Sequence, residues 1–350
     1  MKRKILMTGN EAIGQGAIDA GCNFYAGYPI TPQNELTAYM ASKMPQAGRI
    51  FIQAESEIGA INMVFGASGA GARAMTSSSS PGISLKQEGI SYIAGAELPA
   101  VIVNIMRGGP GLGNIWPAQS DYFQATRGGG HGDYHCMVLA PASVQESYDL
   151  MFDAFNLADK YRNPVIILGD GMLGQMMEPL ETGSSKGQIQ AYKKPWAVTG
   201  CRGRGPNIVK SFYMAEGDLE RFNIGLQKKY GIIRRKEARY EGRFLDAAET
   251  IIVAYGSMAR IARGAVNQLR AEGRKVGFIR PITLWPFPTK AFAINKKKKT
   301  RYLVIEMSYG QMVEDVRLSL EGSARVEFLG RSGGGVPAEN DIIMKVRRMK

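Results

Sequence analysis

Arg107 is a side chain whose type and position could hold a negatively charged ligand. It follows the apolar segment 101–106 and begins the glycine-rich run Arg107-Gly-Gly-Pro-Gly111. In α/β proteins, ligands bind at the carboxyl ends of parallel strands, and a guanidinium can grip a carboxylate through two parallel hydrogen bonds. The alternative is a surface arginine that caps a loop.

Thr31 lies in a loop whose backbone is restricted on both sides. The stretch Tyr28-Pro-Ile-Thr-Pro32 contains two prolines, and each proline limits the backbone of the residue before it. Ile30 and Thr31 are therefore held in a defined loop that could present the Thr31 hydroxyl to a ligand. Taken alone, the stretch indicates a structural turn.

Two carboxylates, Glu55 and Glu57, stand at the start of a helix expected over residues 57–71. A carboxylate can exchange a proton with a bound ligand, but in the first turn of a helix it is also favoured by the helix dipole. Without further information the second interpretation is preferred for both. The small residues of this helix are expected to let a neighbouring backbone come close.

The two histidines, His131 and His135, lie with Asp133 and Cys136 in a spacing that imitates a metal cluster. The segment is a glycine-rich loop and no other histidine can complete a site, so a metal is not expected. His131 could instead contact a substrate from a loop that lines the site.

Two other stretches resemble catalytic motifs without completing them. Gly169-Asp-Gly171 resembles the opening of a magnesium-diphosphate motif, but no asparagine follows Asp170 before Asn207, so the oxygen ligands of the metal are missing. Ser77-Ser-Ser-Ser-Pro-Gly82 has neither the spacing of a serine nucleophile elbow nor the lysine of a phosphate-binding loop. We expect it to be structural or to form one wall of a cofactor site.

The elements that must position these residues are predicted to be of the α/β class. Segments 49–53, 100–105 and 164–168 are short and apolar, and helix-length stretches separate them. This pattern is typical of a doubly wound parallel sheet. Residues 1–180 are expected to form this first domain.

The rest of the chain is expected to contain a connection and a second, smaller α/β domain. Residues 181–245 are loop-like at the start and densely charged towards the end, which indicates a connecting segment with some helix. Residues 246–350 show strand patterns at 250–254, 275–279 and 302–306.

Composition excludes a membrane protein and a disulfide-rich one. The sequence has no run of 18 apolar residues, and no apolar stretch after Met1 is long enough for a secretory signal. We therefore expect a cytoplasmic protein. The three cysteines have no CxxC spacing, so neither disulfides nor an iron–sulfur cluster is expected on this chain.

The formal net charge of +13 could attract nucleic acid. However, its main concentrations, Arg234-Arg-Lys236 and Lys296-Lys-Lys-Lys299, lack interleaved aromatic residues, which favours a solvated basic face. The charge could also attract acidic partners such as coenzyme A or an acidic electron carrier.

Several of these motifs together resemble the α subunits of the 2-oxoacid:ferredoxin oxidoreductases. The resemblance rests on the loop Gly27-Tyr-Pro-Ile-Thr-Pro32, on the helix start Ser56-Glu-Ile-Gly-Ala60, and on the stretches at 107–111 and 129–133. Gly9-Asn-Glu-Ala-Ile-Gly14, Arg280-Pro-Ile-Thr-Leu-Trp-Pro286 and Gly310-Gln-Met-Val-Glu314 are most similar to the branch that acts on 2-oxoisovalerate (3-methyl-2-oxobutanoate).

The resemblance implies a fold and a reaction. The expected fold is the pyrimidine domain of thiamine-diphosphate enzymes followed by a domain like the carboxy-terminal domain of transketolase. The implied reaction is oxidative decarboxylation of a branched-chain 2-oxoacid with coenzyme A, which gives acyl-CoA and carbon dioxide and reduces ferredoxin. Thiamine diphosphate would be shared with a β subunit that carries the diphosphate-binding domain. Mg and iron–sulfur clusters would lie on partner chains, which include γ and ferredoxin-like δ subunits.

The resemblance also implies roles for individual residues. Glu57, preferred over Glu55 because Gly59-Ala60 follows it, would contact the cofactor pyrimidine and act in catalysis. Tyr28, Pro29 and Ile30 would line the cofactor. The substrate would be bound by Thr31, Arg107 and His131.

Two other functions stay open from the sequence. One is the same chemistry on 2-oxoglutarate, whose α subunits share the proline loop and the arginine-glycine-glycine stretch. The other is a non-catalytic basic module that binds nucleic acid.

Overall fold

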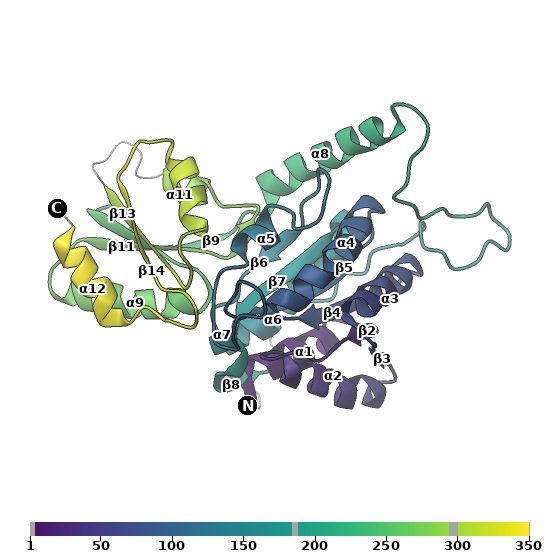
Figure 1. Cartoon of the computed structure of the whole chain (residues 1–350), viewed down its shortest axis with the longest axis horizontal. Coiled ribbons are helices and arrows are strands. Elements are labelled where there is room, and N and C mark those ends of the chain that lie inside the picture. The colour runs from purple at the N-terminus through teal and green to yellow at the C-terminus, as the bar shows by residue number, and fades with distance from the viewer. Residues whose placement is uncertain (1–3, 184–187, 294–299, 350) are drawn as a thin grey trace.

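A computed structural model describes residues 4–183, 188–293 and 300–349 of the chain (Figure 1). The basic run at 296–299 and most of the expected loop at 183–187 lie outside these residues. Two lobes, each built on a mainly parallel sheet, are connected by a long excursion that ends in a helix (Figure 1).

The larger lobe contains a seven-stranded sheet. Its edge strand β12 (Thr283–Trp285) runs antiparallel to the neighbouring strand, and the other six strands are parallel. Its central strands are short, fully buried apolar runs, as expected of strands covered on both faces. In spatial order the strands are β12 (Thr283–Trp285), β6 (Met137–Leu139), β7 (Pro164–Asp170), β5 (Ala100–Met106), β4 (Ala74–Ser78), β2 (Phe24–Gly27) and β3 (Ile50–Gln53).

Seven helices belong to this lobe in the described part of the chain. They are α1 (Gly9–Asp19), α2 (Asn34–Gln46), α3 (Glu57–Gly69), α4 (Ser80–Gly95), α5 (Tyr122–Thr126), α6 (Val144–Tyr161) and α7 (Gly171–Gln175). A small antiparallel ribbon pairs β1 (Lys4–Thr8) with β8 (Met177–Glu181). Helix α1 packs against α6 and α2, and α3 packs against α4.

The close contact between α3 and α4 depends on a glycine of α4. A methyl group at Gly89 would lie 2.5 Å from a side-chain carbon of Ile61, so only glycine lets Ile61 fit there. The expectation that the small residues of α3 provide the approach is wrong at Gly66 and Gly69, where a methyl group would meet nothing within 4 Å.

The chain between β8 and the second lobe extends away from the body and returns as α8 (Asp218–Lys236) (Figure 1). The buried residues of this helix are Leu226, Tyr230 and Ile233. They follow one another at intervals of four and three residues and therefore lie on one face. The charged side chains cover the remaining faces.

The smaller lobe contains a five-stranded sheet and four helices in the described residues. Its strand order is β14 (Val326–Gly330), β13 (Arg301–Glu306), β10 (Thr250–Val253), β11 (Val276–Pro281) and β9 (Tyr240–Arg243), of which β9 is antiparallel. Its helices are α9 (Gly256–Ala271), α10 (Lys290–Ala293), α11 (Met312–Leu320) and α12 (Glu339–Arg348).

Two strands cross the expected division of the chain at residues 180 and 245. β9 comes from the expected connecting segment but forms the edge of the second sheet, and β12 comes from the second half but pairs with β6 of the first sheet. The division itself stays a prediction. Within the described residues, no helix is long and apolar enough to cross a membrane.

Candidate active site

The amino end of α4 contacts the end of β5 and the loop that follows it. Ser80 Oγ accepts a hydrogen bond of 3.0 Å from the backbone N–H of Arg107 and donates one of 2.6 Å to Asp121 Oδ2. Asn104 Nδ2 donates to the same Asp121 oxygen at 2.9 Å. Burial raises the pKa of Asp121, and these hydrogen bonds oppose the shift. The end of β5 is thereby anchored to α4.

Arg107 is a buried arginine, which excludes the surface interpretation. Only 9% of the residue is exposed. Its guanidinium donates 2.9 Å to the backbone carbonyl of Thr31 and 3.1 Å to that of Leu112, while Nε is buried without a partner. Since a guanidinium has five N–H donors, Arg107 joins the two predicted substrate loops and still has donors for a ligand.

Glu57 lies in the first turn of α3, which the side chain of Ser56 caps by accepting from the N–H of Gly59. Glu57 is 6% exposed, so the exposed helix-end interpretation is wrong for it. Its carboxyl faces the amino end of α4, because a methyl group at Gly82 would lie 2.7 Å from Glu57 Oε1. Within the described part of the chain no hydrogen bond to this carboxyl is found, and it is free to contact a ligand.

Glu55 has a different environment from Glu57. It is exposed, and its carboxylate lies over the start of α3, where a methyl group at Gly59 would come within 2.3 Å of Oε1. The two glutamates therefore differ in burial, and the interpretation as a dipole-favoured carboxylate fits Glu55.

Lys86 is a residue near Glu57 that the sequence analysis missed. It is fully buried in α4, one turn after Gly82, and its Nζ donates 2.9 Å to Thr76 Oγ1 on β4. Burial lowers the pKa of Lys86 to about 7, and the charge of Glu57 opposes this shift. The signal in the sequence is its place in the apolar stripe of Ile83, Ile90 and Ile93, where a lysine is unusual.

The proline loop after β2 is held in place from its carboxyl side. Gln33 Nε2 donates to the carbonyl of Tyr28 at 3.2 Å, and Gln33 Oε1 accepts 2.7 Å from Ser77 Oγ on β4. Thr31 is half-buried, and its hydroxyl oxygen accepts 3.1 Å from Asn34 Nδ2. Tyr28 and Pro29 are exposed, and Ile30 is half-buried.

His131 is not near the other predicted substrate residues. The loop before it packs on Gln87 and Ser91, from the middle of α4 onward, and His131 itself lines a cavity with Tyr92 and Gly95 in the last turns of this helix. At 1.5 Å per residue, Ser91 lies roughly 14 Å along the helix from Gly82. The role of His131 in substrate binding stays a prediction that this placement does not support.

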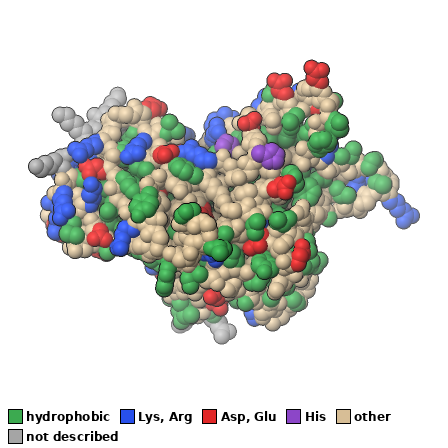
Figure 2. Space-filling view, in the orientation of Figure 1, with side chains coloured by type: hydrophobic (Ala, Val, Ile, Leu, Met, Phe, Trp, Pro, Cys, Tyr) green, Lys and Arg blue, Asp and Glu red, His purple; other side chains and the backbone are tan. Residues whose placement is uncertain are grey.

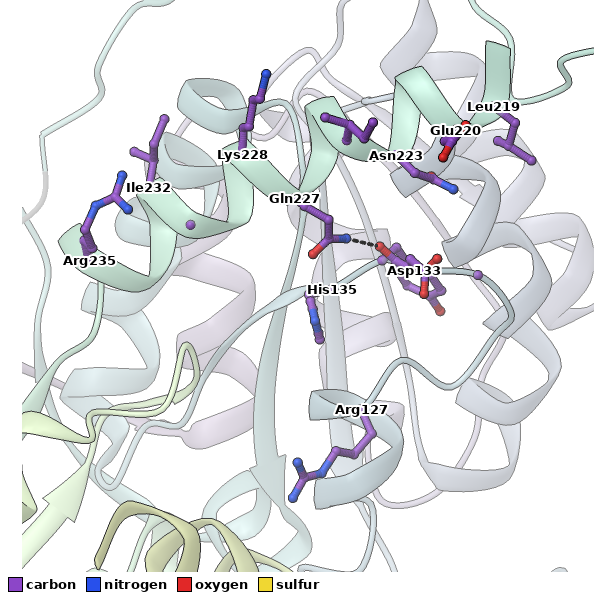
Figure 3. Close-up of a pocket in the computed structure, with 14 residues that line it drawn as sticks. Arg127, Asp133, His135, Leu219, Glu220, Asn223, Gln227, Lys228, Ile232 and Arg235 are labelled. Carbon is purple, nitrogen blue, oxygen red and sulfur yellow. Dashed lines mark hydrogen bonds between the residues drawn. The ribbon is translucent and has the colours of Figure 1, made fainter. Parts of the chain in front are cut away.

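The loop of the two histidines borders a large groove beneath α8 (Figure 3). The groove has a volume of about 1240 Å³, and Gln227 of α8 donates 2.9 Å to the carbonyl of Asp133 across it. His135 stacks on Trp285 at a centroid distance of 4.5 Å. Burial, together with the neighbouring Arg234, lowers its pKa to about 4. In the described residues no group of three or more His, Cys, Asp or Glu could hold a metal.

Asp170 of the Gly-Asp-Gly stretch has a structural role. Its Oδ1 accepts from the N–H groups of Met172 and Leu173, at 3.1 and 3.0 Å, and 2.7 Å from Ser257 Oγ of the second lobe. The carboxylate thus caps α7 and holds α9 against the first lobe.

Exposed apolar side chains surround the amino end of α4. Leu112, Ile115 and Trp116 follow Arg107 in its loop and are 81%, 54% and 61% exposed. Ile58 follows Glu57, and Tyr28 projects from the proline loop; both are exposed. Figure 2 shows patches of hydrophobic side chains on the face of the larger lobe that it presents. Such a surface is typical of a contact with another protein.

Comparison with family models covers most of the chain. The family described as "Pyruvate flavodoxin/ferredoxin oxidoreductase, thiamine diP-bdg" matches residues 15–233. "Pyruvate:ferredoxin oxidoreductase core domain II" matches residues 248–342. The two matches correspond to the larger lobe with α8 and to the smaller lobe.

Curated relatives match over nearly their full length. The ketoisovalerate oxidoreductase subunit VorB of Methanothermobacter thermautotrophicus is 52% identical, over 98% of this chain and 97% of the relative. The 2-oxoglutarate synthase subunit KorA of Archaeoglobus fulgidus is 42% identical, over 89% of this chain and 90% of the relative.

Two solved structures have a similar fold. The 2-oxoglutarate:ferredoxin oxidoreductase from Magnetococcus marinus, solved with 2-oxoglutarate, coenzyme A and succinyl-CoA bound, superposes with a TM-score of 0.85 at 30% identity. The match covers 99% of this chain but 65% of that longer chain. A split-gene transketolase, an inactive β4 tetramer, has a TM-score of 0.60 at 14% identity and shows the fold alone.

Proposed function

Because this chain belongs to the 2-oxoacid:ferredoxin oxidoreductase subunit family, we propose that it supplies the pyrimidine side of a thiamine-diphosphate site. The assembled enzyme oxidatively decarboxylates 3-methyl-2-oxobutanoate with coenzyme A. The products are isobutyryl-CoA, carbon dioxide and reduced ferredoxin. Identities of 52% and 51% to two VorB subunits favour the branched-chain acid over 2-oxoglutarate.

The environment of Glu57 is the observation that carries this proposal. A buried carboxyl whose oxygens are free, at the start of a helix and beside the glycine of a second helix, fits the N1′ nitrogen of an aminopyrimidine. When bound, thiamine diphosphate supplies a nucleophilic carbon. Glu57 would hold the aminopyrimidine at N1′ by sharing a proton with it, which is the contact that activates this cofactor. Tyr28, Pro29 and Ile30 form the wall next to it.

Arg107 and Thr31 fit the carboxylate of the 2-oxoacid. The Arg107 side chain is already fixed by two backbone carbonyls, so it loses little side-chain entropy when its remaining N–H groups donate to the substrate. The Thr31 hydroxyl can donate a further hydrogen bond. Both residues would orient the 2-oxo carbon towards the cofactor.

The rest of the site comes from partner chains. Asp170 cannot serve as a metal ligand in its present place, since its Oδ1 is used by two backbone N–H groups and Ser257. We assign the diphosphate and Mg to a β subunit that covers the exposed apolar side chains around Arg107. The γ and ferredoxin-like δ subunits then provide the iron–sulfur clusters.

Two of the sequence predictions take their place within this proposal. Apart from β9, which joins the second sheet, and β12, which joins the first, residues 1–180, 181–245 and 246–350 act as the pyrimidine domain, the connecting segment and the transketolase-like domain. The protein is assigned to the cytoplasm. Because the chain belongs to this enzyme family, we prefer the proposed function to the alternative of a basic nucleic-acid-binding module.

The test is reduction of ferredoxin or viologen by the complex that co-purifies with this chain. The complex is given 3-methyl-2-oxobutanoate, 2-oxoglutarate or pyruvate, each with coenzyme A and thiamine diphosphate. Preference for the branched acid is expected. Preference for 2-oxoglutarate would keep the mechanism and change the substrate, while no activity with any acid would overturn the proposed function.

A further inference from the structure

Lys86 is a buried cation for which the fold alone gives no reason. It is fully buried in the apolar stripe of α4 that Ile83 and Ile90 also occupy. Its ammonium has three N–H donors, and the bond to Thr76 Oγ1 uses one of them. Enclosing a charged amine in this way is costly, and a methionine would fill the same stripe without the cost.

The position of Lys86 relative to Glu57 follows from the helix that carries it. Gly82 and Lys86 are four residues apart and therefore lie on one face of α4. Gly82 touches the carboxyl of Glu57, so the lysine side chain lies one turn further along the same face, deeper in the lobe. The Glu57 carboxyl thus has bound cofactor expected on its open side and a cation on its enclosed side.

The other charged groups around α4 are occupied elsewhere. At its amino end Asp121 accepts from Ser80 and Asn104, and Arg107 donates to two backbone carbonyls. At its carboxyl half, the Tyr134 hydroxyl accepts from the N–H of Gly130. Glu57 is the charged group that acts on Lys86, and it favours the protonated amine.

We propose, on the basis of the function proposed above, that Lys86 is a positioning residue that acts through Glu57. Holding N1′ by a shared proton would place negative charge on the buried carboxyl of Glu57. In its protonated form, which the charge of Glu57 favours, the enclosed amine of Lys86 stabilises that carboxylate. Lys86 therefore contributes to cofactor activation without touching the cofactor or the substrate.

The experiment uses the assembled complex with Lys86→Met, which keeps the length and apolar packing of the side chain. We expect the variant to assemble and bind thiamine diphosphate, with kcat/KM reduced about tenfold or more and the acid limb of its pH profile moved to higher pH. Lys86→Gln, which is neutral but can still form a hydrogen bond with Thr76, should show the same reduced kcat/KM and the same shifted pH profile as Lys86→Met. Lys86→Arg, which keeps the charge, should retain more activity than either.

A matched control is Lys229→Met. Lys229 of α8 also has its pKa lowered by burial, but it pairs with Glu97 at 3.0 Å, in another part of the lobe. This change should leave the pH profile of kcat/KM unchanged. Any effect of Lys86→Met on the profile would then not be a general result of removing a buried lysine.

A double-mutant cycle with Glu57→Gln tests whether Lys86 acts through Glu57. If it does, adding Lys86→Met to Glu57→Gln lowers the residual rate no further. Additive losses, an unchanged pH profile of Lys86→Met, or failure of both neutral variants to assemble would each overturn the inference while the wild type stays active. An inactive wild-type complex would overturn the proposed function as well.

Discussion

The guanidinium of Arg107 donates a 2.9 Å hydrogen bond to the backbone carbonyl of Thr31, 76 positions earlier in the chain. This bond connects the glycine-rich loop after β5 to the proline loop after β2. A second bond, to the carbonyl of Leu112, folds the Arg107 loop back on itself. One side chain therefore orders both of the loops that we assign to the substrate.

Arg107→Lys should raise the KM for the 2-oxoacid by about tenfold to a hundredfold in the assembled complex. A lysine offers a single ammonium in place of a planar fork, so it cannot hold both carbonyls and a carboxylate. The measurement is steady-state viologen reduction against 2-oxoacid concentration.

Arg49→Lys is the matched control for Arg107. Arg49 also donates to backbone carbonyls, those of Ile18 and Cys22, but no predicted site residue is among its partners. The Arg49→Lys variant should have a lower free energy of unfolding and an unchanged KM for the 2-oxoacid. An equal change of KM in both variants would contradict the assigned role of Arg107.

Glu57→Gln should lower kcat by about a hundredfold or more, because an amide cannot share the proton that N1′ requires. Glu55→Gln should retain nearly the full rate, since Glu55 is exposed and lies over the start of α3. Single-turnover viologen reduction separates the two variants. Near-normal turnover of Glu57→Gln would contradict the proposed role of Glu57 in sharing a proton with N1′.

Gly82→Ala should reduce activity while the protein stays folded. The added methyl group would lie 2.1 Å from Ser78 Oγ and 2.7 Å from Glu57 Oε1, so the carboxyl would have to move away from N1′. Gly66→Ala in α3 would meet nothing within 4 Å and should stabilise the helix by about 0.5–1 kcal/mol. Urea unfolding and turnover of both variants check this contrast. Full activity of Gly82→Ala would show that the Glu57 position tolerates displacement.

His135 should make the protein less stable in mild acid. Its pKa is lowered from 6.5 to about 4 in the fold, so the unfolded chain binds more protons between these values and stability falls as the pH drops through this window. Since the ring is partly exposed, we expect a loss of about 1–2 kcal/mol from pH 7.5 to pH 4.5.

His135→Phe, which can keep the stacking on Trp285, should remove this part of the pH dependence. Urea unfolding at the two pH values measures it, and His131→Phe is the control because His131 is exposed. Equal slopes for wild type and His135→Phe would show that His135 does not carry the effect.

The sequence by itself determined the class of fold, and its resemblance to a known family led to the prediction of Glu57. Runs such as 100–105 are mainly apolar because β5 is buried along its whole length, and a local pattern of this kind can be read without the fold. The motif that follows Glu57 also distinguished it from Glu55, and the burial of the two residues agrees with that choice.

Tertiary structure alone decided which residues meet. The bond from Arg107 to Thr31, the contact of Gly82 with Glu57 and the return of β12 to the first sheet all join segments far apart in the chain. Local propensity carries no information on such pairs, because their energy comes from burial and hydrogen bonds that exist only once the lobes have packed. For the same reason the sequence did not show that the loop of His131 packs on α4 beyond Gln87, or that Lys86, although its place in an apolar stripe is unusual, lies near Glu57.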